Sequence, residues 1–343
     1  MYQKIILIVL LSCSYLLKAE NISGTVLNAE NQPLSNALVY IDGTTFGTNT
    51  DSKGYFFLNY DFVINPVLVV SELFHETVYI SNLADKVDLK LNPKRKSELW
   101  ETKLHPFTRT DAMNVFREQF LGISEAAKSV MFLNEEVIKF AYDKKQNVLV
   151  AFADERIKMK NDFLGYEVDF ELIEFYAVFS KKSMKREAVS KSNFSGTAFY
   201  KELQDSEETQ YERHRERVYY GTSKHFFRNF IQNKWGEFDF ILFEGNSRVV
   251  FFDTFTMERF DDYFVVNINT KDQKGRGSEL SKNSFKSFNT VYRNKKQSSI
   301  IFRTNSFKID MFGNYSNQEE IDINGAMEKS LFGNFLPLNY ILL

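Results

Sequence analysis

The strongest constraint on the fold is a strict alternation of apolar and charged residues. It is clearest at residues 165–172, GYEVDFEL. Four large apolar residues there alternate with three carboxylates: Tyr166, Val168, Phe170 and Leu172 with Glu167, Asp169 and Glu171. Successive side chains of a β-strand point to opposite faces, so one face should be buried and the other solvated and acidic. The same period runs through residues 137–179 without intervening helices, which favours antiparallel pairing.

Two segments break this period and predict helices. Residues 110–122 place Ala112, Phe116 and Phe120 on one helical face, with Gly122 at the exit. We expect Thr110 to cap the start of this helix, and Asp111 suits the positive end of its dipole.

The second helical region covers about residues 207–235. Gly221 is expected to divide it, and Thr222 or Ser223 to cap the second piece. Phe226 and Phe230, with Phe227 beside them, should form its apolar side. Strand-like runs and polar loops fill the remainder of the chain, so the C-terminal part reads as mostly β with two helical segments.

The N-terminal part is built from short strands and tight turns. Pro33 lies in a loop and Asp42-Gly43 is a turn signal. Residues 47–58, GTNTDSKGYFFL, predict a hairpin in which Gly54 takes a left-handed conformation. Many short strands with regular turns predict a small β-sandwich that ends near Asn92.

The turn and apolar positions of this stretch resemble the carboxypeptidase regulatory-like domain. The matching residues are Gly24, Val26, Pro33, Leu34, Ala37, Val39, Ile41, Gly47, Thr48, Thr50, Asp51, Gly54, Phe56 and Leu58. The resemblance covers about a quarter of the chain and implies a seven-stranded, transthyretin-like sandwich. It describes an accessory domain and brings no catalytic residue.

The rest of the chain is similar to a group of envelope proteins of Bacteroidota, known as carboxypeptidase-like regulatory domain-containing proteins. The similar pieces include YYGTSKHFFRNF at residues 219–230 and LPLNY at residues 336–340. This resemblance implies a domain layout and a location in the cell envelope, with no activity to carry over. We therefore expect a mainly β protein: a seven-stranded sandwich, then a larger antiparallel β-rich domain with two helical segments.

The N-terminus predicts export. Lys4 precedes an apolar run at residues 5–11 that is too short to span a bilayer. Cleavage after Ala19 is the favoured interpretation, and lipidation at Cys13 is the alternative. Cys13 is the only cysteine, so an internal disulfide is excluded. The predicted layout is a signal peptide (1–19), the sandwich (20–92), a linker (93–107) and the β-rich domain (108–343). We expect no membrane helix after the signal peptide. The exported product is expected in the periplasm or at the outer membrane.

Charge argues against a nucleic-acid binder. The chain of 343 residues has a formal net charge of −2, whereas such binders usually carry a basic excess. One basic cluster stands out: Lys271, Lys274, Arg276, Lys282, Arg293, Lys295 and Lys296. A solvated loop is the favoured interpretation, and a weak contact with a glycan or an anionic lipid is the alternative.

A metallocarboxypeptidase site needs two histidines and a carboxylate on one zinc ion. The chain has four histidines: His75, His105, His214 and His225. His214 and His225 come closest to a pair, but eleven helical residues span roughly 16 Å. Only a break at Gly221 would bring them together. We therefore predict no metal and no cofactor.

Three further candidate sites have simpler explanations. Ser223 with His225 could be a nucleophile and base, yet Ser223 is expected to cap a helix. Asp42 and Asp51 could bind calcium, yet turn aspartates commonly accept backbone hydrogen bonds. The carboxylates of residues 167–171 could resemble a glycosidase set, yet the solvated side of a sheet explains them.

The sequence therefore predicts a non-catalytic envelope protein that acts as a binding or spacer module for a protein or glycan partner. The alternative is an exported hydrolase built around Glu212, His214 and His225. The two hypotheses differ in whether those side chains converge on one concave site.

Overall fold

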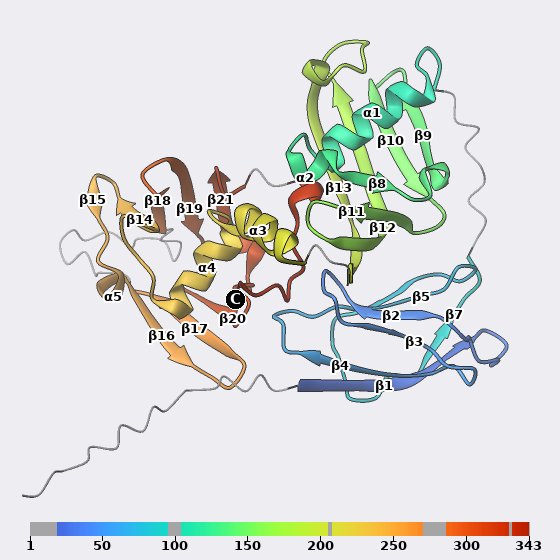
Figure 1. Ribbon diagram of the computed structural model, residues 1–343, viewed down its shortest axis with the longest axis horizontal. Coiled ribbons are helices and arrows are strands. Elements are labelled where there is room, and N and C mark those ends of the chain that lie inside the picture. The colour runs from blue at the N-terminus through green and yellow to red at the C-terminus, as the bar shows by residue number, and fades with distance from the viewer. Residues whose placement is uncertain (1–18, 95–103, 205–207, 270–285, 329–330, 343) are drawn as a thin grey trace, which may run out of the picture.

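The computed structural model describes residues 19–94, 104–204, 208–269, 286–328 and 331–342. Figure 1 shows three bodies around a common centre: a sandwich (blue), a central sheet with one long helix (green), and a C-terminal unit (yellow to red). In the described residues no helix is long and apolar enough to cross a membrane.

The N-terminal sandwich contains seven strands in two sheets. One sheet has the order β4-β1-β7, with β1 (Ala19–Asn28), β4 (Tyr55–Asp61) and β7 (Leu89–Leu91). The other has the order β3-β2-β5-β6, with β2 (Leu38–Ile41), β3 (Gly47–Asn49), β5 (Leu68–Ser71) and β6 (Val78–Ile80). This confirms the predicted seven-stranded sandwich.

The predicted hairpin turn has the expected chemistry. Asp51 accepts hydrogen bonds from the backbone N–H of Lys53 (2.8 Å) and Tyr55 (2.9 Å). Gly54 has a φ of +74°, and a Cβ there would lie 2.4 Å from the carbonyl oxygen of Val26. The turn therefore requires both residues for geometric reasons, and Asp51 is occupied as a turn residue.

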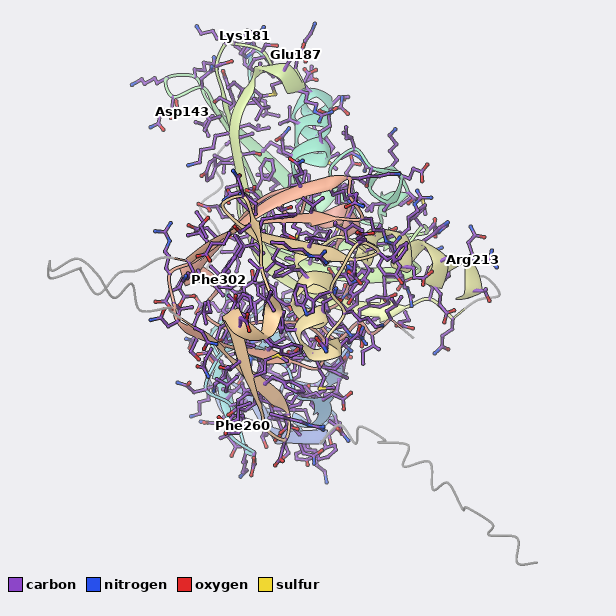
Figure 2. The ribbon with its side chains drawn as sticks, turned by 90° about the vertical axis from the view of Figure 1, so that its left-hand side faces the viewer. Asp143, Lys181, Glu187, Arg213, Phe260 and Phe302 are labelled. Atoms are coloured by element: carbon purple, nitrogen blue, oxygen red, sulfur yellow. The ribbon has the colours of Figure 1, made fainter. Side chains whose placement is uncertain are left out.

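The central sheet is antiparallel and has six strands. They are β8 (Val130–Phe132), β9 (Ile138–Asp143), β10 (Val148–Ala153), β11 (Ile157–Asn161), β12 (Tyr166–Phe179) and β13 (Val189–Glu202). The four apolar residues of the alternating run are all buried, as predicted. In Figure 2 the far end of this body carries Asp143, Lys181 and Glu187.

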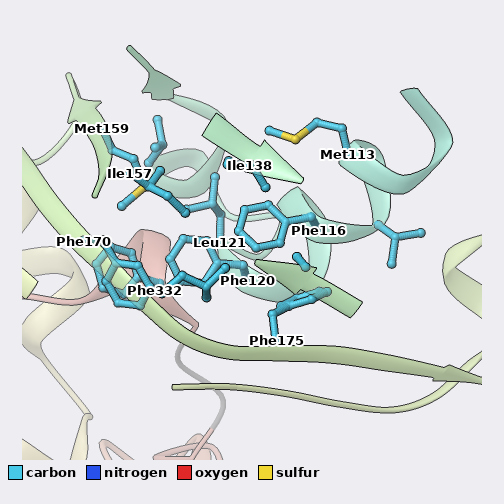
Figure 3. Packing of buried hydrophobic residues seen from close by; sticks show 14 of the residues in the cluster. Met113, Phe116, Phe120, Leu121, Ile138, Ile157, Met159, Phe170, Phe175 and Phe332 are labelled. Carbon is cyan, nitrogen blue, oxygen red and sulfur yellow. The ribbon is translucent and has the colours of Figure 1, made fainter. Parts of the chain in front are cut away.

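Helix α1 (Arg109–Phe120) covers one face of the central sheet and is followed by the short α2 (Glu125–Lys128). Phe116 and Phe120 pack against each other and against the sheet residues Phe170 and Phe175 (Figure 3). The predicted cap was wrong by two positions. Thr108 is the N-cap and forms a capping box with Asp111, because this pair satisfies two free N–H groups at once.

The C-terminal unit holds the second predicted helical region and two more sheets. Its helices are α3 (Glu208–Tyr219), α4 (Ser223–Gln232) and α5 (Phe251–Thr254). The larger sheet has the order β15-β14-β18-β19-β21, with β14 (Phe240–Glu244), β15 (Ser247–Arg248), β18 (Lys286–Tyr292), β19 (Lys296–Phe302) and β21 (Ile321–Gly325). The smaller sheet is β16-β17-β20, with β16 (Phe255–Arg259), β17 (Tyr263–Ile268) and β20 (Ser306–Asp310).

The predicted domain layout stays a prediction, but the packing of residues 108–343 is informative. Their apolar side chains fall mainly into two buried clusters. One belongs to α1 and the central sheet, and the other to α4 and the C-terminal sheets, where Phe226, Phe227 and Phe230 are fully buried as expected.

Candidate functional site at the junction of the three bodies

The C-terminal segment (residues 331–342) joins all three bodies. Phe332 packs into the central cluster, with ring centroids 4.8 Å from Phe120 and 4.9 Å from Phe170 (Figure 3). The N–H of Leu338 donates to the carbonyl of Gly43 in the sandwich (2.7 Å). Ile341 packs against the sandwich core. One short stretch of chain therefore fixes the sandwich against the central sheet.

The backbone of this segment is held by Lys224 of α4. The Lys224 ammonium donates to the carbonyl oxygens of Pro337 (2.8 Å) and Leu338 (2.6 Å). Burial lowers the pKa of Lys224, and the nearby carboxyl of Asp310 compensates this effect only in part.

Asp310 joins the C-terminal unit to the sandwich. Its side chain is fully buried and accepts hydrogen bonds from the N–H of Ile64 (2.9 Å), from the N–H of Phe312 (2.9 Å) and from the Asn314 amide (2.8 Å). Phe312 itself is part of the sandwich core. Burial raises the pKa of Asp310, while the hydrogen bonds counteract that rise.

Two pockets lie on either side of the α3–α4 turn. The first has a volume of about 370 Å³, and its polar and aromatic lining includes Ser223, Lys224, Asn314, Tyr315, Gln318 and Phe335. We call it the junction groove. The second, of about 270 Å³, is lined on the central-sheet side by α2 and Phe163. Both pockets share Val218, Thr222 and Asn334 as walls, so they are neighbours.

The local sequence explains how the turn is shaped. Gly221 has a φ of +82° and divides the two helices, as predicted. Thr222 is the N-cap of α4, and its hydroxyl accepts from the N–H of His225 (3.2 Å). Ser223 is therefore not the cap. It is the first residue of the helix and lines the junction groove instead.

His225 is buried among aromatic rings rather than facing the junction groove. Its Nδ1 accepts from the N–H of Gly221 (3.1 Å), and its Nε2 lies 3.5 Å from a carboxylate oxygen of Asp239. Burial, reinforced by nearby cations, lowers the pKa of His225 to about 3, so the ring is neutral at pH 7. Both ring nitrogens have partners other than Ser223, so the structure does not form the nucleophile–base pair.

The other residues of the hydrolase hypothesis lie elsewhere. His214 stacks on Phe163 with ring centroids 3.7 Å apart, and its Nδ1 lies 2.8 Å from the Phe163 carbonyl oxygen. Glu212 is exposed on α3, beside Arg213, which points outward in Figure 2. The structure gives His214 and His225 no common partner, because one packs on the central body and the other inside the C-terminal unit.

Asp42 has a role that the sequence did not indicate. Its carboxylate accepts from the N–H of Ala198 in β13 (2.8 Å), and the N–H of Gly43 donates to the Ala198 carbonyl (2.8 Å). Burial raises the pKa of Asp42 to about 6. Asp42 is thus a contact between the sandwich and the central sheet rather than a calcium ligand or only a turn residue.

The acidic face of β12 is not wholly solvated, contrary to the prediction. Glu171 accepts a hydrogen bond from the Thr77 hydroxyl of the sandwich (2.8 Å). Asp169 pairs with Lys201 of β13 at 3.2 Å, and Glu167 is exposed. The sandwich packs against this end of the strand, so Glu171 belongs to the interface.

The remaining predicted positions are dispersed. His75 pairs with Glu72 at 2.6 Å within the sandwich, and His105 is exposed. No group of three potential metal ligands occurs among the described residues. Cys13 and the basic residues Lys271, Lys274, Arg276 and Lys282 lie outside the described residues. Arg293, Lys295 and Lys296 are exposed around the β18–β19 turn.

Sequence reasoning missed Lys224, Asn314 and Gln318 as groove residues. Within SKHFF, the sequence around Lys224 predicts an ordinary surface lysine. The segment whose carbonyls it binds, LPLNY at residues 336–340, lies more than a hundred residues further along the chain. A signal was present, since both pieces belong to the resemblance with the Bacteroidota group. The local sequence of either piece does not indicate that the two are in contact.

Comparison with known proteins confirms the N-terminal domain. Residues 22–99 match the model of the CarboxypepD_reg-like domain family. No curated protein matches the chain.

Among solved structures, two chains from type II cohesin–X-dockerin complexes of Acetivibrio cellulolyticus are similar over a limited stretch. The N-terminal interface mutant is 25% identical with a TM-score of 0.18, over 21% of this chain and 51% of that chain. The C-terminal interface mutant is 22% identical with a TM-score of 0.18, over the same shares. The chain thus spans about half the length of these solved chains, and the superposition is too poor to assign a fold or a function.

Proposed function

We propose that the protein is an exported, non-catalytic component of the cell envelope, and that its junction groove binds a glycan. The observation that carries this proposal is the lining of the groove. The polar residues Ser223, Lys224 and Gln318 line it together with the rings of Tyr315 and Phe335 and the apolar side chains of Val218, Met327, Leu336 and Leu338.

This lining suits a sugar better than a folded protein partner. Sugars present hydroxyls that both donate and accept hydrogen bonds, and apolar C–H faces that pack on aromatic rings. The groove volume of about 370 Å³ falls within the range of roughly 300–1,000 Å³ typical of small-molecule pockets. A folded protein would need a much larger contact surface.

The non-catalytic assignment is supported by the partners of the candidate residues. The Thr222 hydroxyl is used as a helix cap, and both nitrogens of His225 are engaged by Gly221 and Asp239. His214 faces a backbone carbonyl. Acyl or glycosyl transfer needs a nucleophile and a base that meet at one reacting atom.

The sandwich acts in this proposal as a rigid spacer. Its contacts with β13, with Asp310 and with the C-terminal segment involve buried hydrogen bonds and apolar packing. The groove is lined by the α3–α4 region, residues 313–318, Met327 and the C-terminal segment. The sandwich therefore supports its walls through the contacts of Asp310 and of the C-terminal segment.

The test is binding and turnover of envelope glycan fragments by the purified chain from residue 20. Ser223→Trp places an indole in the groove, and Ser52→Trp is the matched control on the exposed hairpin turn. We expect the wild type and the control to retain glycan fragments unchanged, and Ser223→Trp to lose binding by about tenfold or more. Equal binding by all three proteins would remove the groove from the proposal. Cleaved fragments would favour the hydrolase instead.

A further inference from the structure

The junction groove has one charged residue in its lining, Lys224. The other polar residues of the lining carry hydroxyl or amide groups, as in Asn314 and Gln318. The phenol groups of Tyr219 and Tyr315 stay protonated near neutral pH, because burial raises both of their pKa values. No carboxylate lines the groove in the part of the chain that the structure describes, so its wall carries a single positive charge.

The Lys224 ammonium group has one hydrogen-bond donor left for a ligand. An ammonium carries three N–H donors and no acceptor. Two of the three reach the carbonyl oxygens of Pro337 (2.8 Å) and Leu338 (2.6 Å). Among the described residues, Lys224 has no third acceptor and forms no ion pair. Because this side chain lines the groove, its third donor can serve a bound molecule.

The charge of Lys224 is compensated only in part by the groups behind the groove. Burial lowers the pKa of Lys224 to about 7, the carboxyl group of Asp310 opposes this shift, and the Arg228 guanidinium adds to it. The oxygens of Asp310 already accept hydrogen bonds from backbone N–H groups and from the Asn314 amide. An anion that binds beside Lys224 would therefore stabilise its charged form.

The first turn of α4 adds to the positive potential of the groove. This helix of ten residues begins at Ser223, in the groove wall, and has no acidic side chain in its first turn. Within the described segments, the N–H groups of Ser223 and Lys224 donate no hydrogen bond. Free N–H groups and the helix dipole both favour an anion at this end. They act together with the ammonium group.

The number of charges indicates a carboxylate ligand rather than a phosphate. A single ammonium matches a group of charge −1, whereas a phosphate monoester carries nearly two charges and is typically held by arginine forks. The groove lining contains no arginine. Glu216, Glu319 and Glu328 are close in sequence to lining residues, but none of them belongs to the lining. A ligand carboxylate therefore meets no like charge on the wall.

We propose that the junction groove selects glycans that carry a carboxylate, and that Lys224 binds this group. The ammonium donates its third hydrogen bond to a carboxylate oxygen, and the first turn of α4 stabilises the same charge. The aromatic rings of the groove pack on the apolar face of the sugar. This inference rests on the proposed glycan binding, and it adds the chemical class of the ligand and the residue that selects it.

The test uses envelope glycan fragments before and after chemical reduction of their carboxyl groups to alcohols, each incubated with the purified chain from residue 20. We expect the wild type to retain the acidic fragments about tenfold or more better than the reduced ones. Lys224→Met should remove this preference. Lys53→Met is the matched control on the exposed hairpin turn and should keep it.

The pH dependence of the wild type provides a second measurement that needs no variant. Retention of the acidic fragments should fall by about tenfold or more between pH 6 and pH 9. Lys224 loses its proton in this range, while the sugar carboxylate stays ionised. Retention of the reduced fragments should stay constant, which separates ligand recognition from any effect of pH on the fold.

The outcomes separate this inference from the glycan proposal. Equal retention of acidic and reduced fragments by the wild type would overturn the selection of carboxylates and leave glycan binding in place. The same pH profile for both kinds of fragment would overturn the role of Lys224. Retention of neither kind would overturn the glycan proposal, and this inference with it.

Discussion

Replacing Phe332 with alanine tests whether the C-terminal segment holds the molecule together. Phe332 is only 7% exposed and packs on Phe120, Phe170 and Tyr200. Buried Phe→Ala substitutions cost about 3–5 kcal/mol, since they lose the burial of the ring and leave a cavity. The surrounding rings come from α1 and from two sheet strands, so the site cannot easily collapse. We therefore expect a loss of about 3–4 kcal/mol in the free energy of unfolding.

The assay is urea denaturation followed by circular dichroism, with limited proteolysis of the native state. Phe335→Ala is the matched control on the same segment, because Phe335 is 37% exposed and should cost only about 1 kcal/mol. The Phe332 variant should also become cleavable within residues 331–342, because the segment is released. A loss below about 1 kcal/mol for Phe332→Ala, with unchanged proteolysis, would refute the claim that this segment joins the bodies.

Three further predictions concern single residues. Asp42 has a pKa of about 6 in the folded protein, above its value of 3.8 in the unfolded chain. Because the folded protein keeps this proton up to a higher pH, the free energy of unfolding falls as the pH rises from about 4 to 6. Asp42→Asn should remove that fall and add about 1–2 kcal/mol to the free energy of unfolding at pH 7, measured by urea titration. His225 has a pKa of about 3 in the folded protein, below its value of 6.5 in the unfolded chain. The neutral ring therefore contributes its full stability above pH 6.5, and this stability is lost as the pH falls toward 3. His225→Gln should flatten this dependence of the melting temperature on pH, measured by thermal melts across the same range. Gly54→Ala should cost about 2 kcal/mol or more by urea denaturation, because the new Cβ would meet the Val26 carbonyl in a left-handed turn, and a neutral result would contradict the role of the turn.

The sequence predicted those parts of the fold that depend on local pattern. The alternation at residues 166–172 gave a buried strand face, and turn chemistry at Asp51 and Gly54 gave the sandwich hairpin. Both follow from period and backbone conformation, which a short window of sequence contains.

Contacts between distant segments could not be predicted in the same way. Asp42 accepts from Ala198, Glu171 accepts from Thr77, and Lys224 holds the backbone near Leu338. Each of these side chains is polar and looks solvent-exposed in its own window of sequence. Their burial results from the packing of one body against another, and a single sequence carries no direct signal of that packing.

The most direct measurement of the central claim is mass spectrometry of envelope glycan fragments after incubation with the wild type and with Ser223→Trp. Fragments recovered bound and intact from the wild type, and unbound from the variant, are the predicted result. New, smaller fragments that appear with the wild type, or retention that is equal in the two proteins, would contradict a non-catalytic glycan-binding groove at the junction.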